Sequence, residues 1–547
     1  MCRRFNMALG PLTSSNAGVA TCKPVRWKNW APMEQKGILA ERLKGRTERC
    51  GPAVGIGCNI RQNRAVPAFP PARDAIQVRR LLPAMTHNPQ VRLALSAICL
   101  ILVAVPTASA EWKEKVLYSF QGGSDGQTPT GGVVFDKARN LYGANTWGGD
   151  LNCLSEGCGT VFQVSPPSQK GGPWTETVLH AFHGPFNGAG DGFNPLGGTI
   201  IDAQGNLYGT TSVGGNGPCV LLGSHVGCGM VYELSPPAQK GGPWTETILY
   251  NFQGGTDGYV PMGDLVFDKH GNLYGATWYG GGKGTNCNEF YGGNCGIVFE
   301  LSPPKQKGGA WTEEILHRFA GVTAGKQAGD GADPNGGLVL DGNGAVYGTT
   351  YFGGTATGEC GTVGCGTVYN LVPPTKKGGA WKEKILWRFN GSNGGGPYAG
   401  VTFHQDGDLY GTTVGGGNNG GGTVFELVPG TSGAWTETVL YRFRDGTDGA
   451  NPDTGVVFDT HGDLYATAYR GDGNSVYGDV FALKPPGRKG EYWSFAILHG
   501  FNGPPDGAAP AGSLRFDKAG NLFGATQAGG TATACQKGCG AVYELEP

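Results

Sequence analysis

The sequence predicts an all-β fold: a seven-bladed β-propeller made of four-stranded antiparallel blades. Four strand signatures recur seven times in a fixed order after residue 110, so that residues 111–547 divide into units of about 62 residues. The composition agrees, because 101 Gly and 35 Pro accompany 39% hydrophobic residues, as expected of many short strands joined by tight turns. A propeller repeats such a four-strand unit around an axis.

Each signature is expected to form one strand. The first is led by Trp, as in Trp112 to Phe120, and the second is a D-G-x-x-P turn followed by a strand that ends in Asp. The third is G-N-L-Y-G and the fourth C-G-T-V-F-E-L. All are rich in β-branched and aromatic residues and bounded by Gly, Pro, Asn or Asp, whereas no stretch after residue 111 has a convincing helical period. A β-helix is the runner-up, but its coils are shorter and its strands parallel.

The order of the signatures predicts how the ring closes. If the Asp-ended strand is A, the G-N-L-Y-G strand B, the Val-Phe strand C and the Trp-led strand D, the repeat region begins with D and ends with C. We therefore expect Trp112–Phe120 to complete the last blade, which closes the ring and protects its edge. The alternative places Trp112 innermost in the first blade, without this closure.

The first 110 residues are expected to lie outside the propeller. An apolar run at 93–105 is followed by Ala108-Ser109-Ala110, so residues 85–110 have the features of a secretory signal peptide. We expect translation to begin at Met85, which makes residues 1–84 a non-native or disordered extension. The alternative is a genuine basic arm that binds nucleic acid or membrane. The first interpretation predicts a secreted protein with no nucleic-acid partner and no membrane span after cleavage.

Ten cysteines of the repeat region occur as pairs, each within the B–C connection of its own repeat. Repeats five and six lack both members of the pair, as disulfide partners should, and export to an oxidising compartment permits the bonds. Zinc is the weaker interpretation, because a zinc site needs four ligands in one place. The predicted disulfides are Cys153–Cys158, Cys219–Cys228, Cys287–Cys295, Cys360–Cys365 and Cys535–Cys539.

The B–C connections are also the most variable parts of the repeat, and variable loops on a rigid scaffold commonly carry binding sites. Aromatic faces beside amides suit sugars or peptides. The alternative is that these side chains pack the loops against one another. The candidate ligand-binding residues are Asn145, Trp147, Trp278, Tyr279, Tyr291, Tyr351, Phe352, Tyr469 and Arg470.

No catalytic set and no resident metal or cofactor is predicted. The chain has no G-x-S-x-G motif and no nucleotide-binding loop. The Asp of the D-G-x-x-P turn is expected to bond its own backbone, with a ring of calcium-binding acids as the alternative. His180, His317 and His499 share one position of strand D with Tyr and Trp and are expected to pack there. His404 replaces an Asp found in the other repeats, which indicates sequence drift or a site.

The units G-G-L-V-F-D, G-N-L-Y-G-T-T and C-G-T-V-F-E-L resemble the GloVer tandem repeat of bacterial exported "choice-of-anchor" proteins. The resemblance covers about residues 111–547. It implies an extracytoplasmic repeat protein, often tethered by a C-terminal sorting segment, and supplies no catalytic residues. This chain ends at Glu546-Pro547, directly after a strand, which favours free secretion.

These observations predict a secreted, monomeric, non-catalytic propeller that serves as a binding or surface-interaction module for a glycan, a peptide or a surface protein. The alternative is an extracellular lyase or hydrolase that acts on polysaccharide at the B–C loop face. An enzyme should gather unlike polar residues from several blades and break the sevenfold pattern. A third possibility is a purely structural spacer, which predicts no aromatic patch in these loops.

Overall fold

The computed structural model of the chain describes residues 112–547, except 154, 185–189, 222–223, 283–294, 307, 323–328, 357, 377, 418, 445–447, 472–476 and 489–490. The predicted extension, 1–84, and the predicted signal peptide, 85–110, lie outside the described residues, as do Tyr291 and Cys287. By its contacts the chain divides into residues 1–105 and 106–547, and all described residues belong to the second unit. No helix among the described residues is long and apolar enough to cross a membrane.

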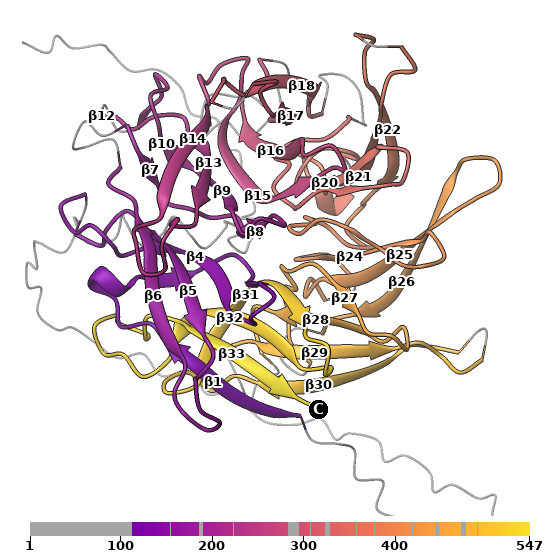
Figure 1. Cartoon of the computed structure of the whole chain (residues 1–547). Coiled ribbons are helices and arrows are strands. Elements are labelled where there is room, and N and C mark those ends of the chain that lie inside the picture. Colours follow the sequence, from indigo (N-terminus) through magenta and orange to yellow (C-terminus); the bar gives the residue numbers. More distant parts are fainter. Residues whose placement is uncertain are drawn as a thin grey trace, which may run out of the picture. The chain divides into compact units, whose positions relative to one another are not determined.

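The predicted propeller is confirmed: seven antiparallel sheets follow one another around a ring (Figure 1). We number the blades 1 to 7 along the chain. The A strands, which lie nearest the axis, are β3 (Val134–Phe135), β8 (Ile200–Ile201), β15 (Tyr259–Phe267), β19 (Val339–Leu340), β23 (Thr402–Phe403), β27 (Val457–Phe458) and β31 (Gly507–Phe516). The B strands are β4 (Leu141–Trp147), β9 (Leu207–Thr211), β16 (Leu273–Tyr279), β20 (Val346–Thr350), β24 (Leu409–Thr413), β28 (Leu464–Ala468) and β32 (Leu522–Gly529).

The two outer strands of each blade follow the same order. The C strands are β5 (Thr160–Ser165), β13 (Met230–Ser235), β17 (Ile297–Ser302), β21 (Thr367–Val372), β25 (Thr423–Pro429), β29 (Asp479–Lys484) and β33 (Ala541–Glu546). The outermost, D strands are β6 (Thr175–Ala181), β14 (Thr245–Asn251), β18 (Thr312–Arg318), β22 (Lys382–Arg388), β26 (Trp435–Arg442), β30 (Ser494–Gly500) and β1 (Lys113–Ser119).

Short elements decorate the loops of the first repeats. They are β2 (Gln127–Pro129), which extends blade 1, the pair β7 (Gly192–Phe193) and β10 (Val213–Gly214), and the pair β11 (Val220–Leu221) and β12 (Ser224–His225). The only helical elements in the described ranges are two 3₁₀ turns, η3 (Gly123–Asp125) and η6 (Gly358–Cys360).

The core lies between blades rather than within them. Phe120, at the end of the D strand of blade 7, is fully buried and meets Phe162 of blade 1 edge-to-face, with ring centroids 4.9 Å apart. The same pair recurs at every blade boundary, for example between Phe182 and Tyr232. The Phe162 ring also explains why the G-N-L-Y-G motif ends in Gly. A Cβ on Gly143 would lie 2.6 Å from the ring of Phe162.

The first strand of the described chain lies in the last blade. β1 pairs antiparallel with β33, so that the order of this sheet is β1-β33-β32-β31. Leu117 and Phe120 then pack in one cluster with Val542 of blade 7 and Leu141 of blade 1. In Figure 1 the indigo β1 lies beside the yellow β33.

Candidate functional site

A cluster of polar side chains lies at every boundary between two blades. We call it a seam cluster: a D-strand side chain of one blade, the first residue of the D-G-x-x-P turn that follows it, and a D-strand residue of the next blade. The seven sets, from boundary 7/1 onward, are Tyr118–Asp125–Glu176, His180–Asp191–Glu246, Tyr250–Asp257–Glu313, His317–Asp330–Glu383, Trp387–Asn393–Glu437, Tyr441–Asp448–Phe495 and His499–Asp506–Glu114.

A β-bulge points the first member into the seam. In β6 the register to β5 shifts between His180 and Val178, which leaves Leu179 without a partner in the ladder. A bulge re-aims the side chains beside it, and here Leu179 packs on the core while His180 reaches the turn. Equivalent shifts occur in the other six D strands.

The turn residue closes the connection from strand D to strand A. Asp257 accepts a hydrogen bond from the backbone N–H of Gln253 at 2.6 Å, and Asp506 accepts one from Asn502 at 2.9 Å. Each Asp thus bonds the backbone directly after the D strand rather than a local Asx turn. The Asx turn forms instead at the end of strand A, where Asp136 accepts from the N–H of Ala138.

Where the first member is Tyr, the seam cluster is hydrogen-bonded. The hydroxyl of Tyr250 lies 2.7 Å from Asp257 and 3.1 Å from Glu313, so it joins two carboxyl groups from adjacent blades. Tyr118 donates to Asp125 at 2.8 Å in the same way. Burial, with the negative charge of the neighbouring Asp, raises the pKa of Glu176 and of Glu313 to about 8.

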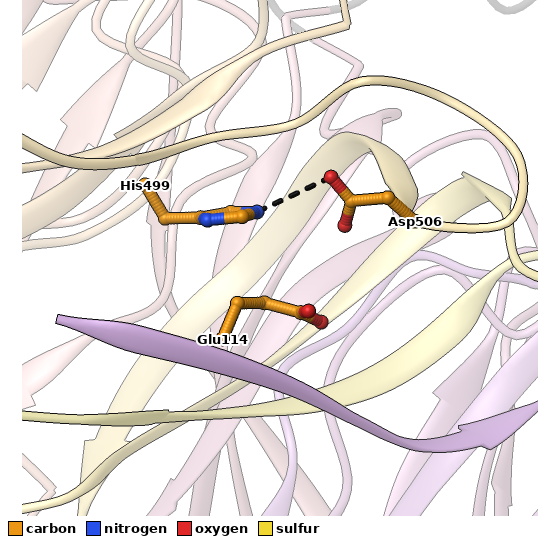
Figure 2. Close-up of side chains that lie close together, drawn as sticks. All are labelled: Glu114, His499 and Asp506. Carbon is orange, nitrogen blue, oxygen red and sulfur yellow. Dashed lines mark hydrogen bonds and ion pairs between the residues drawn. The ribbon is translucent and has the colours of Figure 1, made fainter.

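Where the first member is His, an imidazole nitrogen and two carboxylates face one another, with their ligand atoms all within 4.8 Å. Figure 2 shows one such set, in which Nε2 of His499 lies 3.3 Å from Asp506 and Glu114 approaches from β1. Burial and the charge of Asp506 raise the pKa of Glu114 to about 7, against the opposing charge of His499. These three sets are the ones in the described chain that could hold a metal ion.

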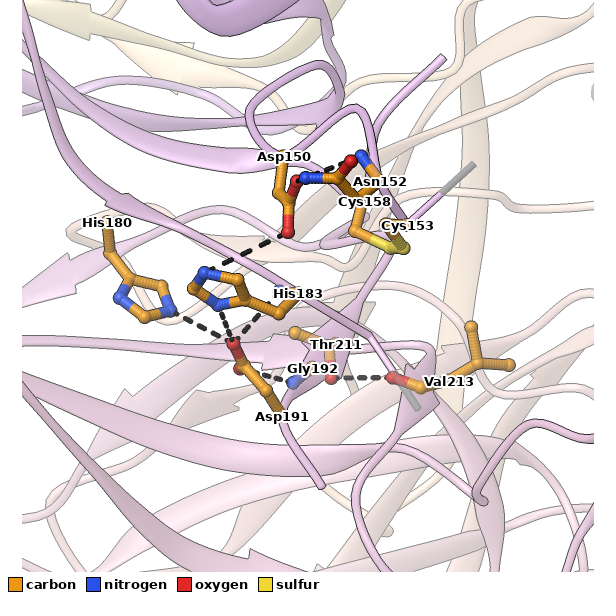
Figure 3. Close-up of a disulfide and its surroundings, with 10 residues drawn as sticks. All are labelled: Asp150, Asn152, Cys153, Cys158, His180, His183, Asp191, Gly192, Thr211 and Val213. Atoms are coloured by element: carbon orange, nitrogen blue, oxygen red, sulfur yellow. Dashed lines mark hydrogen bonds and ion pairs between the residues drawn. A yellow bond between two sulfur atoms is a disulfide. The ribbon is translucent and has the colours of Figure 1, made fainter. Parts of the chain in front are cut away.

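The cluster at boundary 1/2 is larger than the other two. His180 Nε2 lies 3.8 Å from Glu246 and 3.6 Å from Asp191. A second imidazole, that of His183, lies 3.0 Å from Asp191 through Nδ1, and Figure 3 shows both imidazoles beside this carboxylate. On the far side of His183, Nε2 lies 4.0 Å from Asp150. Burial opposes ionisation of Asp191, but the adjacent imidazole of His180 and the hydrogen bonds from His183 outweigh it and lower its pKa to about 2. Burial and the charge of Asp191 raise the pKa of Glu246 to about 7.

Two boundaries depart from the pattern. At boundary 4/5 Trp387 and Asn393 replace the titratable pair, and burial raises the pKa of Glu437 to about 7. At boundary 5/6 the glutamate is replaced by Phe495, which stacks on Tyr441 with ring centroids 4.3 Å apart, while Arg444 pairs with Asp448. These are the repeats whose sequence pattern also departs most from the others.

The loop-face candidates are more buried than expected from the sequence. Asn145 is fully buried and donates to Thr160, and Tyr279 is 4% exposed, so neither side chain is presented on the surface of the loop face. The remaining described candidates are half-buried, namely Trp147, Trp278, Tyr351, Phe352 and Tyr469, apart from Arg470, which is exposed.

Several of these rings pack on one another. Trp147 meets Phe193 of the next blade edge-to-face at 5.6 Å, and Trp278 stacks on Tyr279 at 5.3 Å. Tyr351 and Phe352 are likewise 4.6 Å apart. Among the described residues of the B–C loops, the exposed large apolar side chains are instead Leu151, Val220 and Tyr477.

Four of the predicted disulfides are confirmed: Cys153–Cys158, Cys219–Cys228, Cys360–Cys365 and Cys535–Cys539. Cys295 is also disulfide-bonded, whereas Cys287 lies outside the described residues. Each bond closes a B–C loop on the face that also carries the D–A turns.

A hollow of about 350 Å³ lies between two of these disulfide-closed loops. Its walls come from the turn into blade 1 and from the B–C loops of blades 1 and 7, and its lining is mostly polar. The lining residues are Gly123, Gln127, Leu151, Ser155, Glu156, Ala534, Cys535 and Gln536.

Sequence reasoning missed both the hollow and the third member of the seam cluster. The signal for the latter is present, because Glu follows Trp by two positions in six of the seven D signatures, as in Trp244-Thr245-Glu246. Alternation in a strand places such a Glu on the same face as the Trp. The hollow has no comparable signal, because its lining comes from loops without a shared sequence.

The model of the Gloeobacter/Verrucomicrobia repeat matches residues 102–287 and 356–547, which confirms the resemblance noted in the sequence. No curated protein matches the chain. Among solved structures, the chain is similar to a gluconolactonase of Xanthomonas campestris, with 15% identity, 58% of this chain and 78% of that chain covered, and a TM-score of 0.30. It is also similar to a luciferin-regenerating enzyme, with 13% identity, coverage of 64% and 91%, and a TM-score of 0.35.

Proposed function

We propose that this chain, which belongs to the Gloeobacter/Verrucomicrobia repeat family, is an exported, monomeric binding module that holds a glycan or an extended peptide of a surface protein on its B–C loop face. The observation that carries the proposal is the hollow between the B–C loops of blades 7 and 1. Its volume of about 350 Å³ is within the range of small-ligand sites.

The chemistry of the hollow suits hydroxyl-rich or amide-rich ligands. Gln127 and Gln536 each supply a donor and an acceptor, and Glu156 supplies an acceptor. Leu151, 53% exposed, offers an apolar surface beside them, as the face of a sugar ring or an aliphatic side chain requires. Polar groups that fix orientation beside one apolar wall are typical of such sites.

The loops that frame the hollow are held rigid. Cys153–Cys158 closes the loop that carries Leu151 and Glu156, and Cys535 bonds Cys539 beside Gln536. A rigid loop loses little conformational entropy when a ligand binds. Disulfides in most B–C loops also support export, because such bonds persist in oxidising compartments.

The test is a glycan-array and peptide-array screen of the purified protein, followed by calorimetry with each hit. We expect Glu156→Gln and Leu151→Ala to weaken binding about tenfold or more. Tyr492→Ala is the matched control, because Tyr492 is 93% exposed in a C–D connection, on the opposite face. Binding that survives both loop variants, or that is lost in the Tyr492 variant, would refute this location.

The second candidate function is a lyase or hydrolase that acts on polysaccharide at the same face. One measurement distinguishes it from the binding module. A bound polysaccharide incubated with the protein should be recovered intact if the module only binds. Release of shorter saccharides, abolished by Glu156→Gln, would favour the enzyme, because Glu156 is the acid of the described lining.

A further inference from the structure

The seam cluster at boundary 1/2 differs from its hydrogen-bonded counterparts in a way that points to a ligand. At boundary 2/3 the Tyr250 hydroxyl joins both carboxyl groups within 3.1 Å. At boundary 1/2 the imidazole occupies the same position, but its Nε2 stays 3.6 Å from Asp191 and 3.8 Å from Glu246. Both separations exceed hydrogen-bond length.

Two atoms of this cluster are buried without a hydrogen-bond partner. They are Nε2 of His180 and Oε1 of Glu246, contributed by the outer strands of adjacent blades. A buried polar atom left unpaired is costly, so such atoms usually have a partner. Two of them that face one another imply a shared partner between them.

The separations fit a metal ion as that partner. Bonds of about 2.1 Å from nitrogen and oxygen ligands to a tetrahedral ion place neighbouring ligand atoms about 3.4 Å apart. The distances from His180 Nε2 to the two carboxylates are close to this value. Figure 3 shows that His180 and His183 both point toward Asp191.

The second imidazole is what sets this cluster apart. His183 lies 3.0 Å from Asp191 through Nδ1 and 4.0 Å from Asp150 through Nε2. Asp150 belongs to the loop closed by Cys153–Cys158, and it accepts hydrogen bonds from the backbone and side chain of Asn152 at 2.9 Å each. The clusters around His317 and His499 have one imidazole each.

We propose that His180, Asp191 and Glu246 form a site for a zinc-class divalent cation at the boundary between blades 1 and 2, and that His183 holds Asp191 in place through its hydrogen bond. An imidazole beside two carboxylates suits Zn²⁺ and the neighbouring transition metals, whereas Ca²⁺ and Mg²⁺ prefer oxygen ligands alone. The ion would join two blades and, through His183, lie under the loop that borders the hollow.

The test uses ZnCl₂ alone, titrated by calorimetry into the purified protein without a polyhistidine tag and after treatment with chelator. The key variant is His180→Tyr, because Tyr118 and Tyr250 already occupy the equivalent position in two other seams and keep the hydrogen-bonded cluster. We expect this variant to remain folded and to lose Zn²⁺ affinity at least 100-fold. His183→Asn should lose about tenfold.

His317→Tyr is the matched control, since it makes the same change at boundary 3/4. We expect it to leave the affinity of the strongest site within about threefold of the original protein. Zn²⁺ should also raise the unfolding temperature of the original protein and of this control, but not that of His180→Tyr. The proposal is overturned if the folded protein binds no Zn²⁺ at about 100 times the protein concentration, if His180→Tyr binds as before, or if His317→Tyr removes the same site.

Discussion

Lys113 and Glu546 lie directly opposite one another in one antiparallel sheet, although they come from the first and last strands of the described chain. Six residue pairs connect these strands, and a β-bulge near Leu117 sends that side chain into the cluster shared with blade 1. The last blade therefore depends on the first strand for its outer edge.

Deletion of residues 112–121 should destabilise the whole propeller. The deletion removes the buried side chains Leu117 and Phe120 and leaves β33 as an unpaired edge. Loss of two such side chains costs about 5 kcal/mol or more of unfolding free energy. Chemical denaturation followed by tryptophan fluorescence measures the loss.

The control for this deletion is Lys115→Ala. Lys115 pairs with Glu544 at 3.8 Å, but its side chain is 54% exposed, so the pair contributes about 0.5 kcal/mol or less. If the deletion unfolds at the same denaturant concentration as this variant, β1 is not required for the fold.

The seam glutamates should make the protein less stable as the pH rises. Glu313 faces Tyr250, Asp257 and Arg318; burial, with the charge of Asp257, raises its pKa from 4.5 to about 8. The folded protein then holds a proton that the unfolded chain loses, so this stability is complete below about pH 4.5 and is lost as the pH rises through 8.

Glu313→Gln should remove much of this pH dependence, because the amide resembles the neutral carboxyl group. At pH 9 we expect the variant to be more stable than the original protein by roughly 2 kcal/mol, from a shift of a few pKa units reduced for partial exposure. Thermal unfolding between pH 5 and pH 9 measures it. Glu314→Gln, at the exposed neighbouring position of β18, should leave the slope unchanged; equal slopes for the two variants would contradict this account.

The strands could be predicted from residues that recur with a fixed period in the sequence. Contacts between residues of different blades could not be predicted in this way. The buried Phe120 and its six equivalents recur at fixed distances from Trp, so the strands and their order follow from pattern alone. Glu246 also recurs, but its contact with His180 crosses from one D strand to the next and depends on a bulge at Leu179. Nothing in the sequence marks that bulge.

The loop face shows a second limit. Trp147 and Tyr351 are candidates for ligand binding because they stand in variable loops, and each is half-buried and packs against another ring. A large aromatic side chain in a loop can cover its own sheet as easily as it can meet a ligand. The exposed apolar residue of the hollow is Leu151, which no sequence pattern distinguishes.

The change in stability caused by a substitution at the fourth position of the D-G-x-x-P turn should depend on how well the new residue tolerates a positive φ. All seven residues at this position have positive φ: Thr128, Asn194, Val260, Asp333, Gly396, Asn451 and Ala509. Each N–H donates to a carbonyl of the preceding blade, as Val260 does to Cys228 at 3.0 Å. Each boundary between two blades thus contains one residue in the left-handed backbone conformation.

Val260, with φ of 58°, and Thr128, with φ of 60°, have the least suitable side chains of the seven, because β-branched residues rarely adopt this conformation. Val260→Asn should stabilise the protein by about 1 kcal/mol, since Asn tolerates positive φ and occupies the position in two other turns. The reverse change, Gly396→Val, should cost more than that, because a Cβ there would lie 3.0 Å from the ring of Tyr351. Thermal unfolding measures both, and a loss of stability in Val260→Asn would show that packing of the valine outweighs its strain.

Removal of one loop disulfide should cost stability without changing the blades. Replacement of Cys360 and Cys365 by Ala opens a loop with a sequence separation of 5, which the chain-entropy model values at about 2 kcal/mol. Because blades 5 and 6 keep the same four-stranded sheets without any cysteine, the circular-dichroism spectrum should be unchanged. The measurement is denaturant unfolding of the double variant, with and without reducing agent. Reduction should lower the stability of the variant less than that of the original protein; loss of the β-sheet signal in the variant would instead show that this bond is needed to form blade 4.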